Sequence, residues 1–118
     1  MIKNLNEVPL EDFSECHDGI GILRHSQLLG EKDSACALRF INYTILPPGT
    51  SIGNHKHGDD QEIYLILEGE GEMYLDGVTY PVKTGSVIVN KPFGTHGLVN
   101  NGQRDLKVFV FECGNEPV

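Results

Sequence analysis

Residues 49–69 read GTSIGNHKHGDDQEIYLILEG, and the spacing of the histidines and the glutamate in this stretch is the most informative feature of the sequence. His55 and His57 are two residues apart, so on an extended strand both imidazoles project from the same face. Glu62 follows a polar loop, at residues 58–61, that lets the chain reverse. Glu62 and Tyr64 then share one face of an alternating strand. Imidazole and carboxylate groups brought to one point are donors for a divalent transition metal ion.

A fourth candidate donor, His96, stands 34 residues after Glu62 and follows the turn residues 92–95. Three imidazoles and one carboxylate would hold one ion and leave one or two positions for water or substrate. His17 and His25 lie outside this spacing. Isolated histidines of this kind are typical of solvated or hydrogen-bonded side chains, so we do not assign them to the site.

The rest of the chain predicts an all-β fold in one domain. Short runs rich in β-branched and aromatic residues alternate with Gly, Pro, Asn or Asp. Asp76 and Gly77 between two such runs predict a type I′ hairpin, because both turn positions need a positive φ. The expected strands number seven, which favours a sandwich or barrel. They cover residues 38–46, 63–68, 71–75, 78–82, 86–90, 96–100 and 106–112.

The two ends of the chain carry weaker patterns. Residues 10–13 predict a helical turn, and residues 19–23 predict a short strand. We expect residues 37–112 to form the barrel, residues 1–36 to pack on it and residues 113–118 to form a tail. In the last strand, either the face with Phe109 and Phe111 or the face with Val108 and Val110 fills the interior.

Composition argues against several classes of partner. The net charge is −8, and no two Lys or Arg residues are adjacent, so neither a nucleic acid nor a membrane surface is expected to bind. The longest apolar run, residues 63–67, is far too short to span a bilayer. The first residues do not resemble a signal peptide, and we expect a cytoplasmic protein. Cys16, Cys36 and Cys113 form no CxxC pair that would suggest a thiolate zinc site.

Two motifs of the cupin family can be recognised. Residues 49–69 fit the first motif, G-x5-H-x-H-x(3 or 4)-E-x6-G, at every fixed position. Residues 85–100 match the second, G-x5-P-x-G-x2-H-x3-N, with one residue too many before Pro92 and one too few before His96. The chain therefore resembles the cupins over about residues 37–112. Its first motif is similar to that of small single-domain bacterial monocupins described as oxalate-decarboxylase-like.

This resemblance implies a double-stranded β-helix, which is a jelly-roll barrel, commonly assembled as a homodimer. It implies metal ligands at His55, His57, Glu62 and His96 for one ion of Mn, Fe, Ni, Co, Cu or Zn. One position departs from the oxalate decarboxylases. They commonly carry an Arg three residues before the first ligand His, where its guanidinium group can bind a carboxylate through two hydrogen bonds. This chain has Ile52 at that position.

Two functions from different classes follow. The first is a metalloenzyme that decarboxylates, isomerises or dioxygenates a small oxygenated or carboxylate substrate. In that case Tyr64 would serve as hydrogen-bond donor or acid, although it could equally be a core aromatic residue. Arg39 or Tyr43 would bind an anionic group of the substrate. The alternative is a module that binds a sugar or another metabolite without turning it over.

Overall fold

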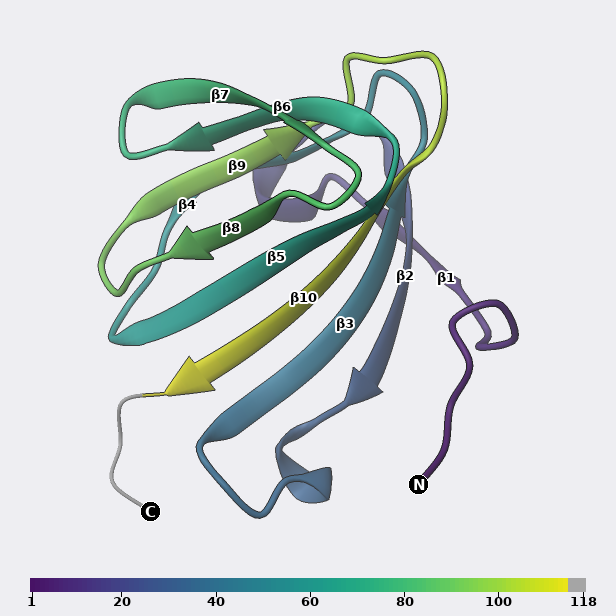
Figure 1. The fold of residues 1–118 in the computed structure, drawn as a ribbon, viewed down its shortest axis with the longest axis vertical. Helices are drawn as coiled ribbons and strands as arrows, with labels where there is room; N and C mark the ends of the chain where they lie inside the picture. The colour runs from purple at the N-terminus through teal and green to yellow at the C-terminus, as the bar shows by residue number, and fades with distance from the viewer. Residues whose placement is uncertain (115–118) are drawn as a thin grey trace.

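Two antiparallel sheets face each other across the core. The structure is a computed structural model that describes residues 1–114. Over that range the six-stranded sheet has the order β1-β2-β3-β10-β5-β8, and the four-stranded sheet has the order β4-β9-β6-β7 (Figure 1). The strands are β1 (Glu11–Ser14), β2 (Ile22–Leu29), β3 (Leu38–Leu46), β4 (Ser51–Lys56), β5 (Asp60–Glu68), β6 (Glu70–Leu75), β7 (Val78–Lys83), β8 (Val87–Asn90), β9 (Thr95–Val99) and β10 (Leu106–Gly114). This arrangement is the jelly-roll barrel predicted from the sequence.

The central strand β10 shows which face of the large sheet points inward. Val108 and Val110 are 0% and 5% exposed and belong to the core between the two sheets. Phe109 packs on the opposite face, against a smaller cluster built on Tyr43 and Ile45. Side chains of the N-terminal segment cover that outer cluster, so Phe109 is partly buried outside the barrel interior. The valine face therefore fills the barrel.

The N-terminal segment adds strands to the large sheet. The expectation of a helical turn at residues 10–13 is wrong, because β1 pairs with β2 with Phe13 opposite Leu23. Cross-strand contacts outweigh the weak local helical preference here, and the Phe13 ring packs edge-on against His25. The strand expected at residues 19–23 starts at Ile22, after Gly21 with a φ of 82°. A short 3₁₀ turn, η1 (Cys16–Asp18), connects β1 to β2. A second, η2 (Glu31–Asp33), follows β2.

The hairpin between β6 and β7 is confirmed. Asp76 and Gly77 have φ values of 48° and 89°, and Leu75 pairs with Val78 across the turn. Both positions therefore have the positive φ that a two-residue turn of this kind requires.

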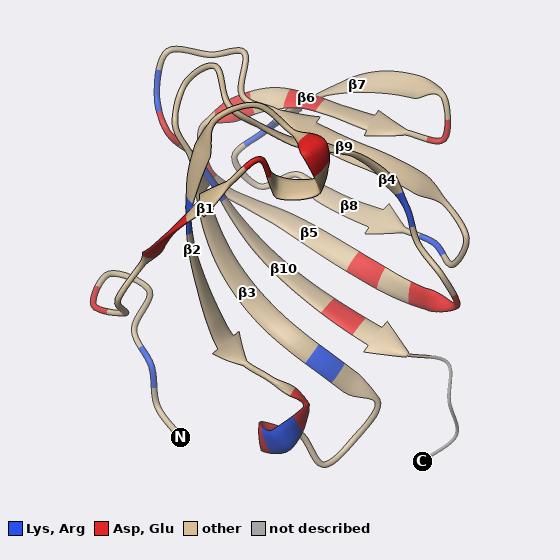
Figure 2. Ribbon diagram, turned by 180° about the vertical axis from the view of Figure 1, so that it is seen from behind, with Lys and Arg blue, Asp and Glu red and all other residues tan. Residues whose placement is uncertain are grey.

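Charged segments of three neighbouring strands meet at one end of the large sheet. Figure 2 shows acidic bands on β5 and β10 beside a basic band on β3. Asp60 and Glu62 lie on β5, Glu112 lies on β10 and Arg39 lies on β3, and Arg39 approaches Asp60 to 3.9 Å. The candidate site begins at this end of the barrel.

Candidate metal centre

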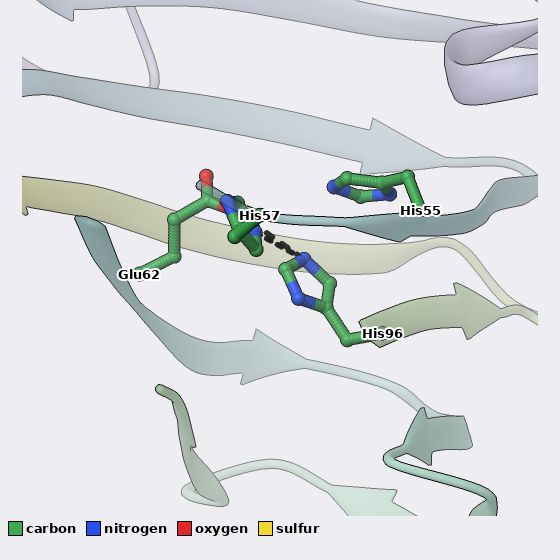
Figure 3. Close-up of side chains that lie close together, drawn as sticks. All are labelled: His55, His57, Glu62 and His96. Carbon is green, nitrogen blue, oxygen red and sulfur yellow. Dashed lines mark hydrogen bonds and ion pairs between the residues drawn. The ribbon is translucent and has the colours of Figure 1, made fainter. Parts of the chain in front are cut away.

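Four side chains from three strands and a loop converge at the mouth of the barrel. His55 lies on β4 directly opposite His96 on β9, and Glu62 lies on β5. His57 follows the end of β4, and its backbone N–H donates to the Gly94 carbonyl at 2.9 Å. Figure 3 shows the four side chains pointing toward one another.

A β-bulge in β4 places His55 on the inner face. Ile52 pairs with Leu98, and His55 pairs with His96, so β4 has one extra residue between these two pairs. Without it, strict alternation would turn His55 away from the face that Ile52 occupies. Gly97 makes the bulge possible, because a Cβ there would come within 2.1 Å of Asn54 Oδ1.

The candidate donor atoms are spaced as around a single ion. His57 Nε2 lies 3.1 Å from His96 Nε2, and Glu62 Oε1 lies 3.3 Å from His96 Nε2. Atoms bound at about 2.1 Å to one ion are about 3.0 Å apart at a right angle and about 3.4 Å apart at the tetrahedral angle. Glu62 Oε1 also lies 2.5 Å from His57 Nε2, yet it is buried without a hydrogen bond of ordinary geometry. The donors fit a divalent transition metal ion, with His55 as the fourth member within 4.8 Å of the others.

Neighbouring groups orient two of the imidazole rings. His55 Nδ1 donates to the Gly53 carbonyl at 2.8 Å, which leaves its Nε2 lone pair free. His57 Nδ1 lies 3.3 Å from Asp60 Oδ1. Partners of this kind on the far ring nitrogen fix the tautomer and the orientation of a metal-binding histidine.

Burial favours uncharged imidazoles in the cluster. Burial, followed by the nearby His55, lowers the pKa of His96 to about 3. Burial also lowers the pKa of His57, against the opposing effect of Glu62, and it raises the pKa of Glu62 itself. Neutral imidazoles have the lone pairs that metal binding needs, and a cation would stabilise the buried carboxylate.

Tyr64 is both a core aromatic residue and a hydrogen-bond donor, the two roles considered from the sequence. Its ring is 3% exposed within the core, and its hydroxyl lies 3.3 Å from His96 Nε2. Burial first, and then the charge of Glu62, raises the pKa of Tyr64 well above its usual value. The hydroxyl therefore keeps its proton and is a hydrogen-bond donor at the site.

The structure separates the two residues suggested for anion binding. Tyr43 lies in the outer cluster with Leu28 and Ile45, on the face of the sheet away from the four donors, so the structure does not bring it to the site. Strand alternation is the reason, since Thr44 and Asn42 face the site instead. Arg39 reaches only the margin of the site, where it approaches Asp60.

Three functional candidates escaped the sequence analysis. Asp60 shares a strand face with Glu62, so alternation could have found it. Glu112 pairs with Glu62 across β5 and β10, and this pairing over 50 residues leaves no local signal. Burial and a hydrogen bond with Asp60 raise the pKa of Glu112 to about 8. His17, expected to stand outside the site, stacks on His55 with ring centroids 3.6 Å apart. His25 is hydrogen-bonded as expected, to Thr44 Oγ1 at 2.8 Å.

A small pocket of about 120 Å³ leads to Glu62 and Tyr64. Its apolar side includes Phe40, Ile52 and Val110. Its polar side is made by His17, His25, Asn42 and Thr44 together with Glu62 and Tyr64. Among the described residues that line the pocket, none is Lys or Arg.

Comparison with known proteins identifies the family. The cupin domain family matches residues 42–112. The chain belongs to the cupin family. The oxalate-binding protein of Thermotoga maritima is 34% identical over 107 residues, which cover 91% of this chain and 88% of that protein. The crystal structure of a predicted oxalate decarboxylase from the same organism superposes with a TM-score of 0.92 at 32% identity, covering 96% of this cupin and 98% of that chain.

A third relative covers only part of both chains. An uncharacterized protein of Methanocaldococcus jannaschii is 42% identical over 73 residues, 62% of this cupin and 57% of that protein. The cupin resemblance and the small monocupin type expected from the sequence are thus confirmed. No helix in residues 1–114 is long and apolar enough to cross a membrane.

Proposed function

We propose that this cupin is a metal-dependent enzyme for a small oxygenated or carboxylate substrate. One divalent transition metal ion would be held by His55, His57, Glu62 and His96. The observation that carries the proposal is the convergence of these four donors beside a small pocket. A cytoplasmic location and a homodimer stay predictions.

The bound ion would supply Lewis-acid polarisation of a substrate oxygen or, with iron or manganese, redox chemistry toward dioxygen. The residues of the chain would perform the remaining tasks. The Tyr64 hydroxyl keeps its proton and can donate a hydrogen bond to substrate at the metal-facing end of the pocket. Phe40, Ile52 and Val110 limit the space for water on the apolar side. Decarboxylation, isomerisation and dioxygenation are all compatible with this arrangement.

A second function, binding without turnover, is favoured by one observation. The relative from Thermotoga maritima is named as an oxalate-binding protein. In this cupin, Ile52 lines the pocket at the position where oxalate decarboxylases commonly carry an Arg. Without that arginine, the carboxylate of a substrate would depend on the metal ion to pair its negative charge.

The test separates the two functions. Protein loaded in turn with Mn, Fe, Ni, Co, Cu and Zn is mixed with oxalate and with small keto and hydroxy acids. Binding is followed by calorimetry, and turnover by CO₂ release, O₂ uptake and NMR. Metal-dependent turnover supports the enzyme, and binding without turnover under every metal supports the binding module. If no compound binds in a metal-dependent way, both functions are wrong.

Tyr64→Phe tests whether the Tyr64 hydroxyl takes part in turnover. It removes only the hydroxyl, so we expect oxalate binding to stay within a few fold of the wild type. A lost proton donor costs about 10²- to 10⁴-fold in rate. A Tyr64→Phe protein with unchanged turnover would remove Tyr64 from the chemistry and leave the metal proposal intact.

A further inference from the structure

The ring of His17 lies flat against the ring of His55. The two centroids are 3.6 Å apart, and the planes differ by only 8°. His55 is one of the four candidate donors, whereas His17 comes from η1, between β1 and β2. This pair joins the N-terminal segment to the candidate metal centre.

The turn that carries His17 is closely fitted to β4. A Cβ on Gly19 would come within 2.2 Å of the Ser51 carbonyl oxygen, and one on Gly53 within 2.0 Å of the His17 carbonyl oxygen. The Ile20 N–H donates to Ser51 Oγ, and the Ser51 N–H donates to the Ile20 carbonyl, both at 2.9 Å. Two glycines and two hydrogen bonds therefore fix the position of η1.

The backbone of the same turn is strained. Glu15, His17 and Asp18 have φ values of 50°, 50° and 59°, in the left-handed region that non-glycine residues seldom adopt. Strain of this kind persists where the surrounding structure holds it, and it is concentrated at ligand-binding and catalytic sites. The contacts of η1 with β4 therefore hold His17 in a conformation that a free chain would seldom adopt.

His17 also forms part of the pocket wall. The same wall contains Asn42, whose Oδ1 is buried without a hydrogen-bond partner, and the hydrogen-bonded pair His25 and Thr44. A volume of about 120 Å³ corresponds to roughly four water molecules in the liquid. These features suit a small ligand with both hydrogen-bond donors and acceptors.

We propose that His17 is a positioning residue for His55 and a contact residue for a small polar ligand. Its ring fixes the plane of His55, and its ring nitrogens are available to the ligand. The ligand is a compact hydroxylated or carboxylated molecule whose negative charge is paired by the metal ion, because no Lys or Arg occurs among the described lining residues. This inference rests on the proposed function.

Two substitutions distinguish the role of the His17 ring in the stack from the role of its nitrogens in ligand binding. His17→Ala removes both, whereas His17→Phe keeps an aromatic ring for the stack and removes the nitrogens. Asp18→Asn is the matched control, because it changes the same turn while asparagine tolerates its positive φ. Thermal unfolding of each variant checks that the fold is retained.

Three quantities are measured on the full chain: the Co²⁺ dissociation constant, the visible spectrum of the Co²⁺ protein, and the oxalate dissociation constant of that protein. For His17→Ala we expect Co²⁺ affinity to fall about 3- to 10-fold and the spectrum to change, since an aromatic stack is lost. For His17→Phe we expect Co²⁺ affinity within about 2-fold of the wild type, while oxalate affinity falls about 10-fold because a hydrogen bond to a charged group is lost. Asp18→Asn is expected to match the wild type in all three.

The outcomes are distinguishable. A wild-type protein that binds no Co²⁺ overturns the proposed function and this inference with it. A wild-type protein that binds Co²⁺ and oxalate, with His17→Ala equal to it in all three measurements, overturns the role of His17 alone. If His17→Phe loses as much Co²⁺ affinity as His17→Ala, the positioning role of the ring is wrong.

Discussion

The two sides of the candidate site, which we call its walls, are built in different ways. The metal-side wall consists of the four candidate donors His55, His57, Glu62 and His96, of which Glu62 also lines the pocket. Glu62 and His96 are buried and lie on strands of the two facing sheets. The N-terminal wall includes His17, which is exposed on a strained turn held by close glycine contacts. The first wall is specified by residue spacing in two motifs, and the second by packing between distant segments. The two walls therefore depend on different parts of the chain, and the stack of His17 on His55 connects them.

The largest expected effect comes from breaking the metal-side wall with Glu62→Gln. A ligand present at about 1,000 times its dissociation constant stabilises a protein by about 4 kcal/mol. We therefore expect the metal-loaded wild type to unfold at a clearly higher temperature than the chelated wild type. Glu62→Gln should show no such difference. Glu68→Gln, at the far end of β5 where Glu68 pairs with Lys107, is the control and should respond like the wild type. Equal stabilisation of Glu62→Gln would exclude Glu62 as a ligand.

Acid should weaken the metal-side wall in the chelated protein. Burial lowers the folded-state pKa of His96 to about 3 from its ordinary value of about 6.5, so the unfolded state binds more protons between these values. Stability due to this group is present above about pH 6.5 and is lost as the pH falls toward 3. From pH 7 to pH 4 the wild type should lose about 3 kcal/mol more unfolding free energy than His96→Gln, since one pKa unit is worth about 1.4 kcal/mol.

Urea unfolding at several pH values checks this difference. Comparing the wild type with His96→Gln cancels the opposite effects of Glu62 and Glu112, whose pKa values are raised. Parallel pH profiles for the two proteins would show that His96 is not held neutral by the fold.

The N-terminal wall is broken by Gly19→Ala. The added methyl group would meet the Ser51 carbonyl oxygen and push η1 away from β4. Overpacking of this kind costs about 1–3 kcal/mol, measured by denaturant unfolding. Gly58→Ala, where no atom lies within 4 Å of the new Cβ, is the matched control. Because the four donors lie elsewhere, we expect Gly19→Ala to retain a metal ion, with an affinity reduced no further than in His17→Ala. Loss of the ion with η1 would contradict the separation of the two walls.

The smallest effect is expected at the β6–β7 hairpin, which contributes no candidate donor although Asp76 accepts a hydrogen bond from the Thr95 N–H next to His96. Gly77→Ala should cost about 1 kcal/mol, because alanine tolerates the φ of 89° poorly and the new Cβ meets only the Tyr74 hydroxyl at 4.0 Å. Gly77→Asn should recover part of that loss, since asparagine accepts a positive φ more readily. Thermal unfolding compares the three proteins. A hairpin variant that altered metal affinity would show that the walls are not independent of the rest of the barrel.

The contrast between the walls also explains what the sequence could predict. His55, His57 and Glu62 lie within eight residues, so strand alternation together with a chain reversal at residues 58–61 predicts that they meet. The bulge at Gly53 and Asn54 that brings His55 to the inner face could not be foreseen, because it depends on the register between β4 and β9.

The other residues of the site could not be predicted, because their positions depend on pairing between segments far apart in the sequence. The closeness of Glu112 to Glu62 depends on the register of β10 with β5, and the stack of His17 on His55 depends on how η1 docks on β4. Residues 10–13 form a strand because β2 offers a partner, which local helical preference cannot reveal. Tyr43 lies in the outer cluster, and the sequence alone does not distinguish the inward from the outward face of its strand.

Elemental mass spectrometry of untagged protein tests the central claim most directly. The wild type is measured beside a His55→Ala, His57→Ala double variant, both after incubation with Mn, Fe, Zn and Ni. The account predicts about one ion per chain in the wild type and a loss of that ion in the variant, because one set of four donors holds one ion. Less than about a tenth of an ion per chain in both proteins would contradict the metal centre, since four intact donors bind tightly when they are deprotonated.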